Sequence, residues 1–241
     1  MPVAMITGGS KGLGRALAEA LAGEGWDLVL DARTAGVLEE AARELRGRYG
    51  SRVAAVPGDV TDAAHRADLV AAAGALGGLD LLVSNASVLD AEPLVRLDAV
   101  PLEGLRRALE VNVVAALGLV QEALPALRAS TAGSVVVVSS DAAAEPYPTW
   151  GGYGASKAAL DQLAAVLSEE EPGLRVWAVD PGDMATDLYA AAVPEGADEV
   201  RPSPRSVAPA FLRLVRERPA SGRYTAPALL EGSAGQDGDA R

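Results

Sequence analysis

Two side chains four residues apart, Tyr153 and Lys157, form the part of this sequence best suited to acid–base chemistry. Residues at positions i and i+4 share one helix face, so a helix here would bring the lysine ammonium close to the tyrosine phenol. A free tyrosine has a pKa of about 10, and a neighbouring cation lowers it by favouring the phenolate. Tyr153 is therefore a candidate general acid and base. The Y-x-x-x-K spacing alone is common on helices, so its meaning depends on its surroundings.

A glycine-rich turn near the start of the chain is suited to holding a phosphate. It spans Thr7 to Gly14 and lies between an apolar strand candidate and an Ala-rich helix candidate. Gly8 permits a tight turn, Gly12 lets the backbone approach a phosphate, and Gly14 lets the helix pack close to the strand. The spacing differs from the G-x-G-x-x-G of most dinucleotide-binding folds, but its place between strand and helix predicts nucleotide binding.

Residues at the end of the second strand candidate bear on which nicotinamide cofactor is used. An acidic residue there would bind a ribose 2′-hydroxyl, whereas an Arg accommodates a 2′-phosphate, and this chain has both Asp31 and Arg33. Arg33 and Lys11 can converge on one phosphate, with Asp31 either pointing elsewhere or holding Arg33 in place. Alternatively, both cations are solvated surface charges. Because Lys is nearly absent from this chain, we favour NADP(H) over NAD(H).

Lys and Asn are scarce, and their positions are informative. The two Lys are Lys11 and Lys157, and the two Asn are Asn85 and Asn112. Codon drift in a high-GC genome would explain the scarcity. It does not explain why all four fall among the candidate site residues.

The elements that would position these residues alternate between apolar runs and longer stretches of helical period, as in βαβ units. We predict one α/β domain over 1–230, a Rossmann-type doubly wound parallel sheet of about seven strands with helices on both faces. Ligands of such sheets bind at the carboxyl ends of the strands. The strand candidates are 2–7, 27–31, 52–56, 79–84, 133–139, 174–179 and 223–229. The helix candidates are 12–24, 35–49, 62–76, 101–129, 153–170 and 205–217.

Composition excludes several other classes of chemistry. The chain of 241 residues has no Cys and one His, His65, so we expect no disulfide, thiol nucleophile or bound metal. A net charge of −12 argues against nucleic acid as a partner. No uninterrupted apolar run approaches the ~18 residues of a membrane span, and no signal peptide is evident, so we expect a soluble cytoplasmic protein. Residues 231–241 are predicted to be a disordered tail.

Together these pieces resemble the short-chain dehydrogenase/reductase family over about residues 2–190. The matching residues are Thr7 to Gly14, Asp59-Val60, Ser84-Asn85-Ala86, Asn112, Ser140, Tyr153, Lys157, Pro181-Gly182 and Thr186. The resemblance implies that Ser140 orients a substrate carbonyl and Tyr153 donates the proton. It also implies that Lys157 binds ribose and tunes the phenol, and that Asn112 supports a water relay.

The predicted cofactor-binding residues combine the turn, the second strand and the resemblance. They are Gly8, Ser10, Lys11, Gly12, Leu13, Gly14, Arg33, Asp59, Val60, Asn85, Ala86, Tyr153, Lys157, Pro181, Gly182 and Thr186. The resemblance places Asp59 and Val60 beside adenine, Asn85 and Ala86 in the cofactor groove, and the 181–186 loop beside nicotinamide. In the alternative interpretation, Asp59 is the N-cap of the helix at 62–76, and Asn112 is a polar residue satisfied between two helices.

The chain also departs from the family pattern. Ser87 stands where Gly is expected, which would narrow or polarise the groove. The usual closing strand and its Asp-Gly-Gly ending are replaced by residues 222–230, where Pro227 would suit only an edge or a strand end. This puts the family's tetramer in doubt. We expect a homodimer or homotetramer, and the Ala/Leu/Val stripes of 101–129 and 153–170 would serve either a dimer interface or plain core.

The substrate is expected under a capping segment at about 183–204, which is apolar in its first half and has no Lys or Arg cluster. The predicted substrate pocket is Ser87, Tyr147, Trp150, Asp183, Leu188 and Tyr189. The first functional hypothesis is an NADPH-dependent carbonyl reductase, or the reverse alcohol dehydrogenase, acting on a small molecule. The others are a catalytically silent NADP(H)-binding regulatory or scaffold protein, and an NAD(H)-dependent enzyme of epimerisation or oxidation. The full set of Asn112, Ser140, Tyr153 and Lys157 argues against a silent protein.

Overall fold

Parallel strands form one sheet in the order β3-β2-β1-β4-β5-β6-β7 in the computed structural model, which describes residues 1–194 and 201–234. The strands are β1 Val3–Ile6, β2 Asp27–Ala32, β3 Val53–Pro57, β4 Leu81–Ser84, β5 Ser134–Val138, β6 Arg175–Asp180 and β7 Gly222–Thr225. The order reverses between β1 and β4, where a doubly wound sheet has its ligand crevice. The predicted Rossmann-type sheet is confirmed, and its seven strands match the predicted number.

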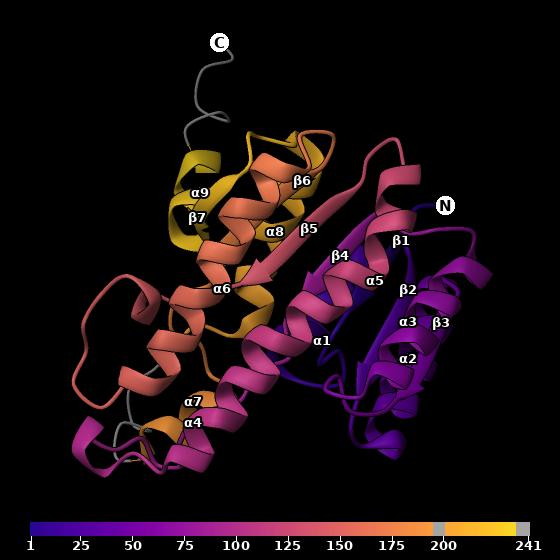
Figure 1. Cartoon of the computed structure of the whole chain (residues 1–241). Helices are drawn as coiled ribbons and strands as arrows, with labels where there is room; N and C mark the ends of the chain where they lie inside the picture. Colours follow the sequence, from indigo (N-terminus) through magenta and orange to yellow (C-terminus); the bar gives the residue numbers. More distant parts are fainter. Residues whose placement is uncertain (195–200, 235–241) are drawn as a thin grey trace.

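Helices cover both faces of the sheet (Figure 1). One face carries α1 Gly12–Gly23, α2 Ala35–Tyr49 and α8 Pro204–Glu217, and the other carries α3 Ala63–Leu76, α5 Ala116–Ala129 and α6 Gly151–Glu170. Alternate strand residues point to opposite faces, so Ala4 and Ile6 join one core while Val3 and Met5 join the other. Strands that helices cover on both faces are continuous apolar runs in the sequence, so they can be predicted from it.

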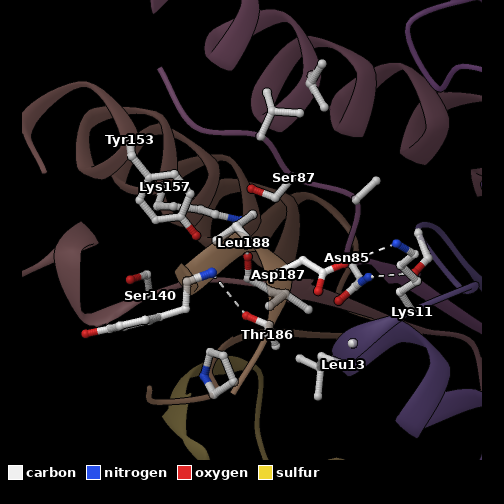
Figure 2. A pocket seen from close by; sticks show the side chains of 18 of the residues that line it. Lys11, Leu13, Asn85, Ser87, Ser140, Tyr153, Lys157, Thr186, Asp187 and Leu188 are labelled. Atoms are coloured by element: carbon white, nitrogen blue, oxygen red, sulfur yellow. Dashed lines mark hydrogen bonds and ion pairs between the residues drawn. The ribbon is translucent and has the colours of Figure 1, made fainter. Parts of the chain in front are cut away.

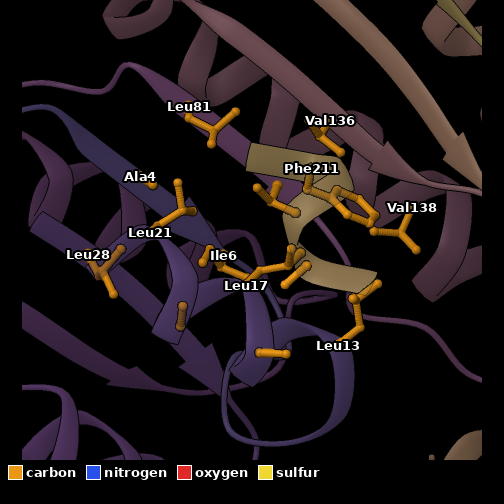
Figure 3. Close-up of a cluster of buried hydrophobic side chains, with 14 of the residues drawn as sticks. Ala4, Ile6, Leu13, Leu17, Leu21, Leu28, Leu81, Val136, Val138 and Phe211 are labelled. Carbon is orange, nitrogen blue, oxygen red and sulfur yellow. The ribbon is translucent and has the colours of Figure 1, made fainter. Parts of the chain in front are cut away.

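Figure 3 shows the first core, in which Leu13, Leu17 and Leu21 of α1 face the sheet. Their spacing of four residues places all three side chains on one helix face. Phe211 of α8 closes the same cluster beside Val138 (Figure 3). This packing sets the position of the α1 N-terminus relative to the end of β1.

The predicted helix at 101–129 is present but is not uniform. It consists of α4 Leu102–Leu109, a π-helical turn η2 Glu110–Ala115 and α5. A π turn widens the helix locally and is frequent at functional sites. Asn112, one of the two Asn residues, lies in this turn and is buried.

The same segment bears on the expectation that no apolar run approaches the length of a membrane span. Within the described residues, Leu102–Ala129 is a 28-residue helix whose most apolar window has a mean hydropathy of 1.3, enough by length and composition to cross a membrane. The expectation considered uninterrupted apolar runs, whereas an average over a long helix tolerates interspersed polar residues. Buried helices of proteins that never meet a membrane pass the same test, and Leu119, Val120 and Leu127 pack in the second core.

The C-terminal region differs from its prediction. The strand expected at 223–229 is limited to β7, which pairs with β6 as the sheet edge, and residues from Ala226 form helix α9 Ala226–Ala234. Pro227 therefore lies in the first turn of a helix, where its missing N–H costs no hydrogen bond. The tail predicted from 231 is wrong for 231–234, which belong to α9, and 235–241 lie outside the described residues.

Two further helices gather at the end of the molecule toward which the strands point. Helix α7 Asp187–Ala192 and helix α4 both lie there (Figure 1). The backbone N–H of Leu94, in the loop before α4, donates to the carbonyl of Ala192 at 3.3 Å. Helix α7 belongs to the predicted capping segment, of which residues 195–200 lie outside the described residues.

Candidate active site

A groove of about 1520 Å³ opens at the carboxyl ends of the strands. It is lined by every residue predicted for the cofactor, catalytic and substrate sets except Gly14 and Asn112, which lie behind its wall. Figure 2 shows Tyr153, Lys157 and Ser140 at one end and Lys11 and Asn85 at the other, with residues 186–188 between them. Segments far apart in the sequence thus form a single site.

The glycine turn has the geometry that its sequence predicts. Gly8 and Gly12 have φ angles of +65° and +53°, which side chains disfavour. A Cβ on Gly14 would lie 2.3 Å from the carbonyl oxygen of Gly8 and 2.7 Å from the side-chain nitrogen of Asn85. That nitrogen donates to the carbonyl of Thr7 at 2.8 Å, so Asn85 ties the loop after β4 to the turn.

The start of α1 fits a phosphate group. Lys11, its N-cap residue, makes no side-chain cap, so no cap side chain meets the N–H groups of the first turn. These groups and the positive end of the helix dipole favour an anion, and Ser10, Gly12 and Leu13 line the groove at this point. The donor set and the glycine cradle therefore fit the diphosphate of a dinucleotide.

Asp31 lines the groove, but its carboxylate is bound to other groups, and within the described residues it makes no hydrogen bond to Arg33. Its Oδ1 accepts a hydrogen bond from the backbone N–H of Gly8 at 2.7 Å, and its Oδ2 lies 3.2 Å from Nε2 of buried His65. Arg33, two residues later, is exposed and lines the groove. Asp31 and Arg33 were the two candidates for contact with the cofactor ribose. Of these, Asp31 already interacts with other groups of the protein.

Lys11 forms an ion pair that the sequence did not suggest. Its ammonium lies 3.1 Å from Oδ2 of Asp187, the first residue of α7, and both side chains are exposed. Thr186 caps the same helix, accepting from the N–H of Tyr189 at 3.2 Å. The glycine turn and the capping segment therefore meet across the groove. That Lys11 also contacts a 2′-phosphate stays a prediction.

Asp59 is not the N-cap of the third helix. Asp62 caps α3, whereas Asp59 accepts hydrogen bonds from the backbone and hydroxyl of Thr61 at 3.0 and 2.8 Å. The backbone hydrogen bond from Thr61 lowers the pKa of Asp59, and Arg33 and Arg107 add to the shift. Asp59 therefore sits in the groove as an ionised residue among cations, a position open to a ligand.

Tyr153 and Lys157 occupy the first two turns of α6, with the ammonium 5.5 Å from the centroid of the phenol ring. Burial raises the pKa of Tyr153 above its usual value, although a hydrogen bond with Ser87 opposes that shift. Burial lowers the pKa of Lys157 to about 8, and its ammonium donates to the carbonyl of Val138 at 2.8 Å. At neutral pH the phenol is therefore protonated beside a charged ammonium.

Asn112 is fully engaged by neighbouring groups. Its Oδ1 accepts from the N–H of Val88 at 2.9 Å and from the hydroxyl of Ser87 at 3.1 Å. Its Nδ2 donates to the carbonyl of Val88 and to Oγ of Ser156, both at 2.9 Å. The side chain thus joins the loop after β4 to α6, as the structural alternative for this residue supposed. The water relay stays a prediction.

Ser140 follows the end of β5 and lines the groove. Its hydroxyl donates to Oδ1 of Asp141 at 3.0 Å and accepts from the N–H of Ala142 at 3.2 Å. Arg223 of edge strand β7 donates to the Ser140 carbonyl at 2.9 Å. Strand β7, at the edge of the sheet, therefore supports the loop that carries Ser140.

Aromatic side chains line the predicted substrate end. The ring of Trp150 lies 5.7 Å from that of Tyr153, edge to face, and 6.2 Å from that of Tyr189. Arg201 lies over the ring of Tyr189, with its guanidinium carbon 4.0 Å from the ring centroid. Ser87 lines the groove at this end, and its interaction with the Tyr153 phenol lowers the pKa of that phenol, opposing the effect of burial.

Several residues of the site were missed by sequence reasoning. Arg106 and Arg107 of α4 and Met184 line the groove, and Asp90 and Ser156 contact the backbone of Tyr153. The sequence carries no local signal for them, because each depends on which loop or helix end lies opposite. Arg106 and Arg107 form a charged pair in the exposed last turn of α4, and such a pair in a sequence is typical of an ordinary solvated helix face.

Comparisons with known proteins agree with this architecture. The sequence pattern described as short chain dehydrogenase matches residues 2–196. An uncharacterized oxidoreductase of Saccharomyces cerevisiae is 36% identical over 189 residues, covering 77% of this chain and 72% of the relative. Bovine dehydrogenase/reductase SDR family member 4 is 37% identical over 190 residues, covering 77% and 67%. The alcohol dehydrogenase of the archaeon Thermococcus sibiricus, complexed with 5-hydroxy-NADP, superposes with a TM-score of 0.85 at 28% identity, covering 93% and 95%.

A doubly wound parallel sheet with a glycine turn and a groove at its carboxyl edge is the arrangement of Rossmann-type dinucleotide-binding folds. The chain belongs to the short-chain dehydrogenase/reductase family.

Proposed function

We propose that this protein is an NADPH-dependent carbonyl reductase, which in the reverse direction acts as an alcohol dehydrogenase. The observation that carries the proposal is the buried phenol of Tyr153, which lies beside the ammonium of Lys157 and lines the groove. That arrangement is suited to giving a proton to an oxygen that is gaining negative charge. The aromatic wall of Trp150 and Tyr189 suits a small organic carbonyl compound.

In this proposal, different side chains of the protein have different roles in the reduction. Bound NADPH supplies the hydride that the carbonyl carbon accepts. Ser140 donates a hydrogen bond to the carbonyl oxygen, and Tyr153 transfers its phenolic proton to that oxygen as charge develops. The Lys157 ammonium stabilises the phenolate left behind. Solvent then returns a proton to Tyr153, and Asn112 supports that path.

The groove residues named above hold the cofactor in this proposal. The α1 N-terminus takes the diphosphate, Asp59 and Val60 flank adenine, Arg33 meets the 2′-phosphate, and Lys157 binds ribose. Pro181, Gly182 and Thr186 hold the nicotinamide end. The NADP analogue bound to the Thermococcus sibiricus relative supports this choice of cofactor.

The direct experiment follows the absorbance of NADPH in the presence of a panel of ketones and aldehydes. We expect consumption of NADPH with at least one of them, and slower consumption of NADH. Binding of NADPH without turnover of any carbonyl would favour a silent binding protein. Activity confined to NAD(H) and alcohols would favour the oxidising alternative.

The Arg33 assignment predicts a selective loss of affinity. In the Arg33→Ala variant, we expect the dissociation constant for NADPH to rise about 10- to 100-fold, the equivalent of one charge-assisted hydrogen bond. Affinity for NADH should stay unchanged, because that cofactor has no 2′-phosphate. Fluorescence titration with both cofactors measures this, and Arg43→Ala, on the exposed face of α2, is the control. Equal losses for both cofactors would contradict the assignment.

The ammonium of Lys157 gives a pH dependence. Its pKa of about 8 means that it loses its proton as the pH rises through that value, and the phenol beside it then becomes a weaker acid. We expect kcat/KM for carbonyl reduction to fall above about pH 8. Because this pKa is lower than in the unfolded chain, folding stability should rise with pH between about 8 and 10.5. A pH profile that stays flat across this range would contradict the role of Lys157.

We further propose that the protein works in the cytoplasm as a homo-oligomer, without a nucleic acid or membrane partner. Val114 of η2, Leu117 of α5 and Val166 of α6 are apolar side chains that expose 54%, 37% and 41% of their surface. Packing against a second copy would bury such side chains. The molar mass from light scattering tests the proposal, and a monomer at working concentration would contradict it.

A further inference from the structure

A buried carboxylate, Asp90, lies against the start of the helix that carries Tyr153 and Lys157. Asp90 follows β4 in the loop that includes Ser87, and it is only 3% exposed. Its Oδ1 accepts a hydrogen bond from the backbone N–H of Tyr153 at 3.1 Å. Its Oδ2 is buried and finds no hydrogen-bond partner within the part of the chain that the structure describes. Such an orphaned buried oxygen is rare in proteins and calls for an explanation.

Helix α6 depends on this residue for its cap. The first N–H groups of a helix have no partners within the helix, and the residue at its N-cap normally supplies one. In α6 that residue is Trp150, which supplies no side-chain cap. The carboxylate of Asp90, from a loop 63 residues earlier, takes this place. The positive end of the helix dipole favours its negative charge.

Gly152 is what allows this close approach. A Cβ at that position would lie 2.2 Å from Oδ2 of Asp90 and 2.6 Å from its Cγ. Any side chain there would push the carboxylate away from the helix. The glycine and the acid therefore act as a pair, one providing the space that the other fills.

The peptide groups on both sides of Tyr153 are held by side chains. Asp90 accepts from its N–H, and its carbonyl accepts from Oγ of Ser156 at 2.7 Å. Ser156 in turn accepts from Nδ2 of Asn112 at 2.9 Å. Asn112 also holds Val88, in the same loop as Asp90. The loop after β4 thus fixes the backbone from which the phenol projects.

We propose that Asp90 is a positioning residue for the proton donor, and that it sets the location of the Tyr153 phenol by capping α6. The proposal rests on the proposed reductase function. Asp90 does not line the groove, so it acts through Tyr153 and not on substrate or cofactor. A displacement of about 1 Å at a reacting group can cost about 100-fold in rate, so a lost cap should be visible in catalysis.

The test compares Asp90→Ala with Asp90→Asn, since Asn keeps an acceptor oxygen and is itself a good cap. We expect kcat to fall about tenfold or more in Asp90→Ala, with the KM for NADPH unchanged within about twofold, and to be largely retained in Asp90→Asn. Melting temperature and cofactor affinity, measured on the same samples, confirm that both variants fold. A kcat preserved in Asp90→Ala, even with a lower melting temperature, would reduce Asp90 to a structural cap and overturn the proposal.

A double-mutant cycle tests whether Asp90 and Gly152 act as a pair. Gly152→Ala alone should lower kcat as Asp90→Ala does, because its Cβ displaces the carboxylate. In the Asp90→Ala background the same glycine substitution should cost little more, since there is no carboxylate left to displace. Fully additive losses would show that Gly152 and Asp90 act independently and would overturn the pairing.

A spectroscopic readout separates this proposal from the proposed function. The ultraviolet titration of the Tyr153 phenol, obtained by subtracting the curve of Tyr153→Phe, requires no substrate. Burial raises the pKa of this phenol, so loosening α6 in Asp90→Ala should lower it toward the ordinary value. Absence of turnover in the unaltered protein would count against the reductase alone. An unshifted phenol in Asp90→Ala would count against the positioning role.

Discussion

Replacing Tyr153 by Phe is expected to lower kcat by about 100- to 10,000-fold while leaving NADPH binding intact. The substitution removes one hydroxyl and with it the only proton that the side chain can give. The ring itself remains, so its edge-to-face contact with Trp150 at 5.7 Å and its contact with the Lys157 ammonium are kept. Steady-state rates with the best carbonyl substrate, together with a cofactor titration, measure the two quantities separately.

A matched control is available in the same chain. Tyr49 lies at the end of α2, outside the groove, and Tyr49→Phe should leave kcat unchanged. If Tyr153→Phe kept the turnover of the unaltered protein, the proton would have to come from another group, and the assigned mechanism would be wrong. If it lost cofactor binding as well, the phenol would be a structural part of the groove.

Replacing Gly14 by Ala is expected to lower the affinity for NADPH about tenfold or more. The new Cβ would lie 2.3 Å from the carbonyl oxygen of Gly8 and 2.7 Å from the side-chain nitrogen of Asn85. Both neighbours belong to the phosphate cradle, so either α1 or the turn must shift. Overpacking of this kind costs about 1–3 kcal/mol, and the shift also misaligns the N–H groups that would face the diphosphate.

Gly23→Ala, at the other end of the same helix, is the control. Its Cβ would meet nothing closer than the Cε1 atom of Tyr49 at 3.7 Å, an ordinary contact. Gly in a helix is less stable than Ala by about 0.5–1 kcal/mol, so this variant should bind NADPH normally and melt slightly higher. Calorimetric titration measures the NADPH affinity of both variants, and thermal melting measures their stability. Normal NADPH affinity in Gly14→Ala would show that the close approach seen at Gly14 is not needed for binding.

Most of the fold could be predicted because its signals are local. The buried parallel strands are apolar on both faces, as in Val135 to Val138, and α1 repeats Leu every four residues. The glycine turn is recognisable because backbone geometry at Gly8 and Gly12 restricts the residue type. The same holds for Tyr153 and Lys157, whose spacing on one helix determines their proximity without knowledge of any other element.

The sequence was less informative where local patterns allow two structures. Residues 223–229 read as a strand, yet the chain turns into α9 after Thr225, and Pro227 is compatible with both a strand edge and a helix start. The apolar pattern of residues 101–129 does not indicate the π turn around Asn112. In both places the choice depends on packing against neighbours that a local window does not contain.

Residue types and spacing alone were enough to predict the class of fold, the position of the glycine turn and the proximity of Tyr153 to Lys157. Only the tertiary structure decided which partner each polar side chain takes. Asp31 pairs with His65, Lys11 with Asp187, and Asp90 with the backbone of Tyr153. A carboxylate or ammonium accepts many partners of similar strength, so its choice depends on which donors and acceptors the packed helices bring within about 3 Å. Those distances are properties of the assembled layers, and no stretch of sequence contains them.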